Sequence, residues 1–294
     1  DELEAHPEWD EGAAERFVRG LSSRQLLAEP GERFSYSNIA YNVLGDMIAK
    51  VAGQPFEAAM REQVLVSSGM ADSTFLVADI AAERLAWPHV RTPALRVNPI
   101  YPYHRADAPA SFLHATVVDM CQWAITCLQR GNGPGQRILS PAGYDVMWTP
   151  AAARGSQPGL YEAMGLGWNL GHAGGVKTVS HGGAGFGGTA FLLLLPEGER
   201  AAVVLCNQES DAHSRVVRAM ADALLDRKPQ AGTVSWLVPI SQALAEGGIE
   251  AAYARYDQLK AGEAEAYDFD AYDLDTLVIQ LASAKKIDLA IDVL

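Results

Sequence analysis

Basic residues and cysteines are both scarce in this sequence of 294 residues. Lys and Arg number 23 against 36 Asp and Glu, which gives a formal net charge of −13 at pH 7. A chain this acidic has no basic footprint for nucleic acid or for an anionic lipid surface. The three cysteines, Cys121, Cys127 and Cys206, cannot form a disulfide framework, and they leave the redox compartment open.

Long hydrophobic runs are missing as well. Purely apolar stretches such as residues 190–195 are far too short to cross a bilayer, so we expect no transmembrane helix. Hydrophobic residues make up 49% and charged residues 20% of the chain, which is an ordinary globular balance and excludes a disordered or collagen-like protein. The length allows one large domain, alone or with a small one.

Several chemical signatures are also absent. There is no G-x-S-x-G nucleophile elbow. Residues 183–188 match G-x-G-x-x-G, but a strand-like segment follows where the dinucleotide fingerprint needs a helix, and no Lys-Ser/Thr follows for a phosphate loop. The histidines form no H-x-H or H-x-x-x-H pair, so metal ligands would have to come from distant positions. We expect no cofactor and no metal.

The first half of the chain predicts helices joined by loops. A helix begins near Tyr36, where Ser37 or Asn38 would cap it, and Gly53 is a natural end. Residues 54–115 are predicted to be rich in loops, because prolines recur there. Capping signals at residues 116–119 and 140–141 predict two further helices. The apolar residues of the first helix fall on one face: Ile39, Val43, Leu44, Met47, Ile48 and Val51.

The second half predicts an antiparallel sheet with a helix laid on it. Residues 177–180, 189–195 and 200–206 have strand patterns, residues 196–199 form a hairpin turn, and residues 213–226 are a helix. The expected organisation is a main domain over residues 1–228, a linker at 229–232 and a helical tail at 233–294. In that tail, residues 249–253 resemble residues 287–291, which indicates either tetratricopeptide-like repeats or two ordinary amphipathic helices.

Three short motifs are candidates for chemistry. Tyr36-Ser37-Asn38 stands at a helix start, where it is either functional or a buried tyrosine beside an N-cap. His181 opens the glycine-rich run 181–188, which either lets a ligand approach the backbone or forms a bend between strands. Ser283-Ala-Lys-Lys286 has the form S-x-x-K, but in a helical tail this spacing arises by chance.

In this order the motifs resemble the serine β-lactamase superfamily, in the branch of class C β-lactamases, D-alanyl-D-alanine peptidases and esterases. Tyr36-Ser-Asn38 is followed far downstream by His181-Gly-Gly183, on a strand before a hairpin and a helix. Residues 108–119, 164–168 and 191–207 resemble intervening segments of the family. The resemblance covers about residues 10–226 and implies an α+β fold: an antiparallel sheet flanked by helices, with a helical subdomain.

The resemblance also implies roles for individual residues. A serine in S-x-x-K attacks a carbonyl and forms an acyl-enzyme. Tyr36 matches the tyrosine that moves the proton, a role that needs nearby cations to lower a tyrosine's pKa from about 10. Asn38 would hold the acyl side chain, and His181 would either orient a substrate carboxylate or tune Tyr36 electrostatically. Gly182 and Gly183 would leave the strand bare, and the N–H of Ala184 would be an oxyanion donor.

Two departures from the family qualify this expectation. Residues 1–35 contain no S-x-x-K, so we interpret the chain as an inactive internal fragment of a longer hydrolase. His181 stands where many members have lysine, and histidine is often neutral at pH 7, which favours a peptidase or esterase over a true β-lactamase.

The expected substrate is a small molecule or peptide with a carbonyl and a carboxylate, and the tail would take a protein partner. The alternative is a catalytically dead binding or sensor module. The family implies a periplasmic or secreted protein, although the sequence itself leaves the compartment unknown.

Overall fold

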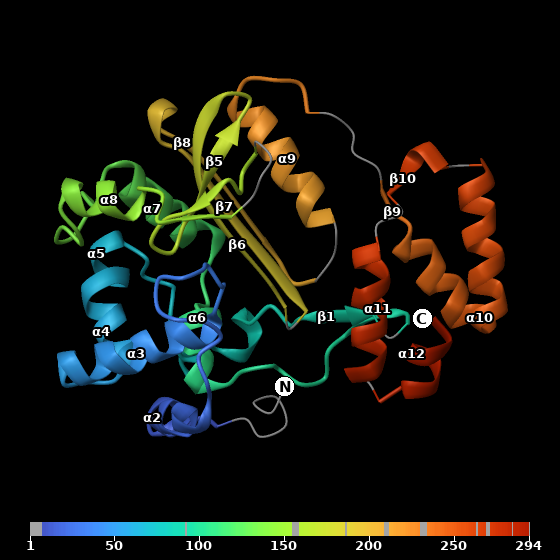
Figure 1. Ribbon diagram of the computed structural model, residues 1–294, viewed down its shortest axis with the longest axis horizontal. Coiled ribbons are helices and arrows are strands. Elements are labelled where there is room, and N and C mark those ends of the chain that lie inside the picture. The colour runs from blue at the N-terminus through green and yellow to red at the C-terminus, as the bar shows by residue number, and fades with distance from the viewer. Residues whose placement is uncertain are drawn as a thin grey trace. The chain divides into compact units, whose positions relative to one another are not determined.

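In the computed structural model the chain forms two compact units (Figure 1). The first comprises Asp1–Leu85, Pro102–Gly183 and Phe191–Val203, and the second comprises Ala86–Tyr101, Ala184–Ala190 and Val204–Leu294. The structure describes residues 8–91, 93–154, 159–185, 187–208, 212–229, 234–262, 264–268, 271–283 and 285–293. The expected domain boundaries stay predictions, and residues 230–232 of the expected linker lie outside the described residues.

The helices of the first unit begin where capping side chains predict. Ser37, Thr116 and Ser140 each accept a hydrogen bond from the backbone N–H three residues later, which confirms the predicted helix starts. The prediction of a loop-rich segment 54–115 is wrong for residues 56–68, where good helix formers fold into α4, a π-helical turn at Arg61–Leu65 and α5. The helices are α2 Ala13–Gly20, α3 Asn38–Ala52, α4 Phe56–Met60, α5 Val66–Ser68, α6 Ala108–Ser111, α7 Val117–Leu128 and α8 Pro141–Met147.

A six-stranded sheet has the strand order β3-β4-β5-β6-β7-β8. The predicted strands are confirmed in the last three of these, and Glu199 takes a left-handed conformation in the predicted turn. β5 and β6 pair antiparallel, from Asn169 opposite Ser180 to Ala173 opposite Val176. The strands are β3 Ala152–Ala153, β4 Ala163–Met164, β5 Asn169–Ala173, β6 Val176–Gly185, β7 Gly188–Leu195 and β8 Arg200–Cys206.

The core of the first unit lies between α7, α8 and the sheet. Its aromatic centre is Tyr144, which is fully buried. The ring of Tyr144 packs edge-on against the ring of Trp148, with the ring centroids 5.5 Å apart. Burial in this core raises the pKa of Cys127 to about 12. The buried members of the cluster are Ala124, Cys127, Tyr144, Trp168, Leu170, Val179, Leu192 and Leu194.

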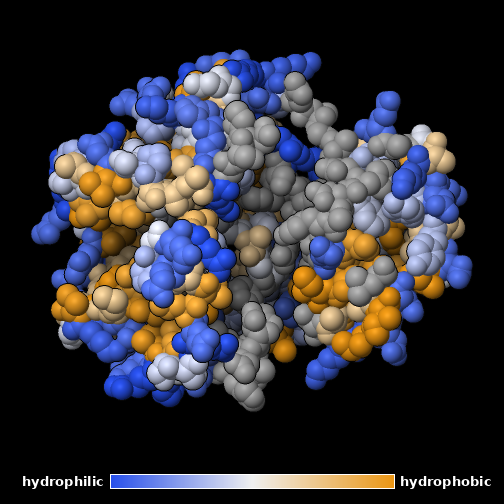
Figure 2. Space-filling model, viewed as in Figure 1, coloured by the Kyte–Doolittle hydropathy of each residue, from blue (hydrophilic) through white to orange (hydrophobic). Residues whose placement is uncertain are grey.

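The apolar face of α3 is exposed. Val51 is 89% exposed, and the buried positions of this helix are instead Asn42, Gly45 and Asp46. Figure 2 shows hydrophobic surface in the region of this helix. The periodicity therefore groups these residues on one face correctly, but that face is not a buried one. The other large exposed side chains of the predicted face are Ile39, Leu44, Met47 and Ile48.

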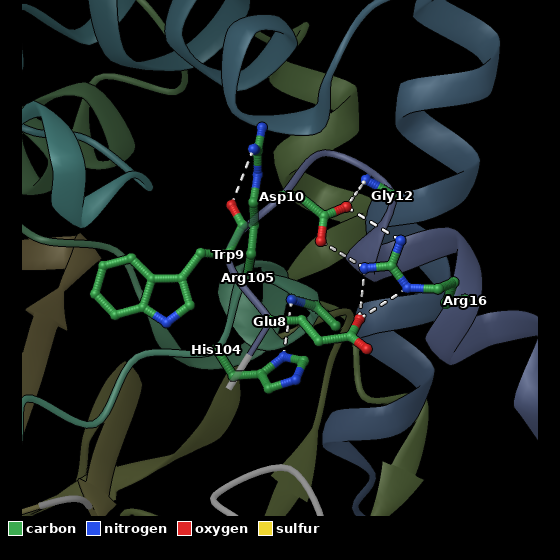
Figure 3. A network of polar contacts seen from close by, with 8 residues as sticks. Glu8, Trp9, Asp10, Gly12, Arg16, His104 and Arg105 are labelled. Atoms are coloured by element: carbon green, nitrogen blue, oxygen red, sulfur yellow. Dashed lines mark hydrogen bonds and ion pairs between the residues drawn. The ribbon is translucent and has the colours of Figure 1, made fainter. Parts of the chain in front are cut away.

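Polar contacts hold the segment before α2 against the segment before α6 (Figure 3). Arg16 pairs with Glu8 at 2.7 Å and with Asp10 at 2.6 Å, and the backbone carbonyl of Glu8 accepts a hydrogen bond from the N–H of Arg105. The Arg105 guanidinium forms a largely buried ion pair with Glu57 at 2.7 Å. Breaking the Arg105–Glu57 pair would leave an uncompensated buried charge, so Arg105 is held firmly in place. Through its hydrogen bond to Glu8, Arg105 in turn positions the segment that leads into α2, and α2 contacts α3.

The second unit contains a hairpin and the predicted helical tail. Trp236, Leu237, Leu259, Leu277 and Leu281 are among the residues of a separate hydrophobic core formed by the helices of the tail. Gly248 breaks α10 with φ 73° and ψ −166°, so residues 249–253 begin its second half, whereas residues 287–291 lie in α12. The elements are β1 His89–Arg91, β2 Leu95–Val97, α9 Ala212–Leu224, β9 Val234–Ser235, α10 Leu237–Gly262, β10 Tyr267–Asp268, α11 Ala271–Ser283 and α12 Ile287–Val293.

Two further expectations concern repeats in the tail and membrane-spanning helices. The similarity of residues 249–253 to residues 287–291 remains a prediction that the tail contains a repeat. No helix in the described part of the chain has both the length and the apolar character that a membrane span requires.

Replacing Gly45 by alanine should destabilise the first unit. A Cβ at Gly45 would lie 2.1 Å from Cγ and 2.6 Å from Cβ of Pro109, whose ring cannot swing aside. Overpacking of this kind costs about 1–3 kcal/mol, which outweighs the helix propensity of up to about 1 kcal/mol that alanine adds. Urea unfolding should show a lower midpoint for Gly45→Ala. The control is Gly20→Ala in α2, where nothing lies within 4 Å of a Cβ, and equal midpoints for the two variants would contradict the expectation.

Candidate active site

Tyr36 and His181 are far apart in the sequence, yet they lie together in the first unit. Tyr36 directly precedes Ser37, whose side chain caps α3, so the turn into the helix fixes the tyrosine backbone. His181 directly follows Ser180, which is fully buried in β6. The two rings have centroids 6.4 Å apart at an interplanar angle of 32°. Tyr36 is 52% exposed, so this pair is open to a ligand.

The strand beyond His181 offers bare backbone. The pairing of β5 with β6 ends at Ser180, so Gly182 and Gly183 lie past the end of that ladder. A Cβ at Gly183 would meet nothing within 4 Å, which leaves room for another chain to approach. Ala184, the expected oxyanion donor, is the next residue of β6 and belongs to the second unit.

Asn38 and the S-x-x-K of the tail complete the predicted residues. Asn38 is the first residue of α3 and is exposed. Ser283 is the last residue of α11 in the second unit, and its side chain lies outside the described residues. The described residues contain no cluster of three His, Cys, Asp or Glu that could hold a metal ion.

A cation that the sequence analysis missed lies beside the Tyr36–His181 pair. Arg154 follows edge strand β3, and its backbone N–H donates to the carbonyl of Glu162. Its guanidinium carbon is 6.0 Å from the centroid of the Tyr36 ring and 5.1 Å from that of Tyr161. Its Nη1 donates to Oδ1 of Asn169. The one available signal was that Arg154 is the only Lys or Arg between Arg137 and Lys177.

The electrostatics of this group favour a neutral imidazole. Burial lowers the pKa of His181 below its ordinary value, a hydrogen bond involving the backbone of Gly182 raises it, and the positive charge of Arg154 lowers it further. With the net pKa below 6.5, His181 is neutral at pH 7. The site therefore combines a phenol, a neutral imidazole, a fixed guanidinium and a bare strand.

Comparisons with known proteins show the family and the fold of this chain. The family model described as "Beta-lactamase" matches residues 1–227. The D-alanyl-D-alanine-carboxypeptidase/endopeptidase AmpH of Escherichia coli K12 is 28% identical over 159 residues, which cover 50% of this chain and 38% of AmpH. The unguisins hydrolase ungD' of Aspergillus campestris is 27% identical over 225 residues, covering 72% of this chain and 41% of that protein. The chain thus spans about two fifths of these curated relatives.

Solved structures share the fold. The octameric penicillin-binding protein homologue of Pyrococcus abyssi superposes with a TM-score of 0.66 at 22% identity, covering 80% of this chain and 51% of that one. The D-amino acid amidase of Ochrobactrum anthropi has a TM-score of 0.56 at 22% identity, covering 68% of this chain and 57% of its own. Both confirm the mixed helical and antiparallel-sheet architecture. Because this family model matches residues 1–227, which is well over half of the chain, the chain belongs to the beta-lactamase family.

Proposed function

We propose that this chain carries part of the active site of a serine hydrolase that works through an acyl-enzyme on amide, ester or β-lactam carbonyls. The observation that carries the proposal is the juxtaposition of Tyr36 with His181 at 6.4 Å, beside strand backbone that no β5 residue pairs with. In this role the Tyr36 phenol moves the proton between nucleophile and leaving group. Asn38 holds the acyl side chain, and the N–H of Ala184 donates to the oxyanion.

The nucleophile is proposed to come from chain beyond these 294 residues, because residues 1–35 hold no S-x-x-K. Two observations support this. The apolar face of α3 is exposed, with Leu44 at 47% and Met47 at 53%, as expected of a helix that further chain covers in the complete domain. The chain also spans only 38% of AmpH.

The substrate is proposed to be a peptide or ester rather than a β-lactam drug. A neutral His181 holds a carboxylate less firmly than the lysine that many family members carry at this position. AmpH is named for acting on D-alanyl-D-alanine and the Ochrobactrum enzyme for D-amino acid amides, which supports a substrate with a D-residue next to the scissile bond. In this proposal the hydrolase domain spans residues 1–228, and the helices from residue 233 form a tail that docks a protein partner.

A second candidate is a binding or sensor module that keeps the cleft and has lost the chemistry. It shares with the first candidate the observation that residues 1–35 contain no S-x-x-K. The longer protein decides between the two, because an intact S-x-x-K supports the enzyme and its replacement supports the binder.

The 294-residue chain should not turn over p-nitrophenyl esters or chromogenic cephalosporins. The reason is that the attacking serine is absent, whereas the remaining groups only assist an attack. Spectrophotometric assays of purified chain check this, with Ser283→Ala as the control for the one S-x-x-K that the sequence does contain. Robust turnover that survives in the control variant would overturn the argument for a missing nucleophile.

In a longer protein that contains S-x-x-K, Tyr36→Phe should slow acylation by about 10²–10⁴-fold, the usual contribution of a positioned acid or base. The ring stays in place, so binding of an unreactive substrate analogue should change little. Stopped-flow acylation by a p-nitrophenyl ester measures the rate, and Tyr161→Phe is the matched control on the neighbouring ring. An unchanged acylation rate for Tyr36→Phe would remove Tyr36 from the mechanism.

His181 should titrate below 6.5, and its burial should make the fold more sensitive to acid. Because the folded-state pKa is lowered, the unfolded chain binds more protons than the folded chain in the pH range between that pKa and the ordinary value of 6.5. The stability that neutral His181 contributes is therefore present above 6.5 and is lost as the pH falls. NMR titration of the imidazole, assigned with His181→Gln, measures the pKa. Urea midpoints should fall more on acidification for the wild type than for His181→Gln, and a titration midpoint at or above 6.5 would contradict this.

A further inference from the structure

The tail carries more than half of the net negative charge of this chain. Residues 233–294 contain eleven Asp and Glu against four Lys and Arg, which gives a formal net charge of −7 out of −13 for the whole chain. A segment of this sign attracts cationic partners and repels anionic ones, a second copy of the same tail included. Its electrostatic character therefore favours a basic partner.

Apolar side chains are exposed on the outer face of α12. Ile287 is 53% and Ile291 is 63% exposed, and their spacing of four residues places them on one face of the helix. Ala290 is buried, and Leu289 and Val293 pack against the core of the tail. Figure 2 shows hydrophobic surface over α11 and α12. The two isoleucines thus form an apolar ridge that the core of the tail does not use.

A row of carboxylates runs beside this ridge. Asp288 and Asp292 directly follow the two isoleucines, so they share a face of α12 next to the ridge, and both are exposed. Neither forms an ion pair with a Lys or Arg in the part of the chain that the structure describes, the neighbouring Lys285 and Lys286 included. The outer face of α12 therefore presents an apolar row and an uncompensated acidic row side by side.

The neighbouring helices of the tail extend this surface. The hydroxyl of Tyr253 in α10 donates to the backbone carbonyl of Asp292 at 3.3 Å, and this tyrosine is exposed. Its ring thus adds apolar surface at the C-terminal end of α12. On α11, which packs against α12, the exposed Asp275 and Ile279 stand four residues apart and repeat the combination of an acid and an isoleucine.

We propose that the outer face of α12, with its isoleucine ridge and its row of aspartates, is a docking surface for a basic amphipathic helix of a partner protein. The inference rests on the docking role that the proposed function gives to the tail, and it does not depend on hydrolysis. In the complex, apolar side chains of the partner cover Ile287 and Ile291, while its Lys or Arg side chains pair with Asp288 and Asp292.

The pattern on α12 distinguishes this partner from others. An apolar row beside an acidic row, both at a spacing of four residues, is complementary to a helix with an apolar stripe and basic residues next to it. A second copy of this chain would bring aspartates to aspartates, and like charges across an interface disfavour association. The same charges disfavour nucleic acid and anionic lipid.

The test measures binding of the 294-residue chain to a fluorescently labelled synthetic peptide of leucine and lysine, whose leucines fall on one face of a helix. Two matched probes have the same length. In one, glutamate replaces every lysine, and in the other the order is scrambled so that no face is apolar. Fluorescence anisotropy should show the basic amphipathic peptide binding about tenfold or more tightly than either matched probe. Added sodium chloride should weaken this binding, because salt screens exposed charge pairs.

Two double variants separate the apolar and the acidic row. Ile287→Gln with Ile291→Gln should weaken binding of the basic peptide by about tenfold or more, because the apolar area is no longer buried. Asp288→Asn with Asp292→Asn should weaken it by about 2–30-fold, the contribution of two exposed ion pairs, and should reduce the dependence on salt. The exchanged side chains are exposed, so the tail should stay folded, which circular dichroism checks.

The matched control is Val238→Gln with Glu246→Gln, which changes exposed side chains of the same kinds in the first half of α10. It should leave the affinity unchanged. Undiminished binding to the isoleucine variant overturns the proposal, because the peptide would then bind elsewhere, and so does the absence of binding.

Two further outcomes would assign the surface to a different partner. Equal binding of the lysine and glutamate peptides would keep a docking tail but overturn the basic partner. A dimer of the chain that sedimentation detects and that the isoleucine variant abolishes would assign the face to a second copy and overturn the proposal. Acylation of the longer protein tests the hydrolase separately, so peptide binding that depends on α12, without acylation, would uphold this inference and reject the enzyme.

Discussion

The antiparallel register between β5 and β6 is the constraint on which the site depends. It sets Asn169 opposite Ser180. Asn169 accepts the hydrogen bond from Arg154, and Ser180 directly precedes His181, so this one pair of residues relates Arg154 to His181. Because side chains alternate between the faces of a strand, a slip of one residue would turn His181 to the opposite face and bury it away from Tyr36. The buried core between α7, α8 and the sheet, with Leu170 and Val179 as neighbours in the same ladder, makes such a slip costly.

Charge in the proposed site is divided between two residues in a way that burial explains. His181 follows Thr178, Val179 and Ser180, which are buried in β6, and desolvation disfavours the charged form of His181. Arg154 lies in an exposed position after edge strand β3 and brings a guanidinium to the site. The positive charge of the Arg154 guanidinium also lowers the pKa of His181, which further favours the neutral imidazole.

Local signals in the sequence predicted much of this structure. Capping by Ser37, Thr116 and Ser140 depends on residues only three positions away, and the strands around the 196–199 turn follow from alternation and turn chemistry. The proximity of Tyr36 and His181 was expected only through the family resemblance, because nothing local joins the two residues. Arg154 was missed because its neighbours Tyr36 and Asn169 are set by tertiary structure. The exposed face of α3 shows a further limit: periodicity identifies which residues share a face, but not whether another element covers it.

The starting point of β5 has a consequence for how much of the β6 backbone is left open for the peptide substrate that we propose. β5 begins at Asn169, so β6 runs on past its neighbour from His181 with its backbone groups unmatched on that side. An extended peptide laid there would act as a continuation of β5, and Asn169 would be the stop against which its end abuts. Lengthening β5 by two residues at its N-terminal end would therefore place new strand residues opposite His181 and Gly182, and would leave less of the β6 backbone open to the peptide substrate that we propose.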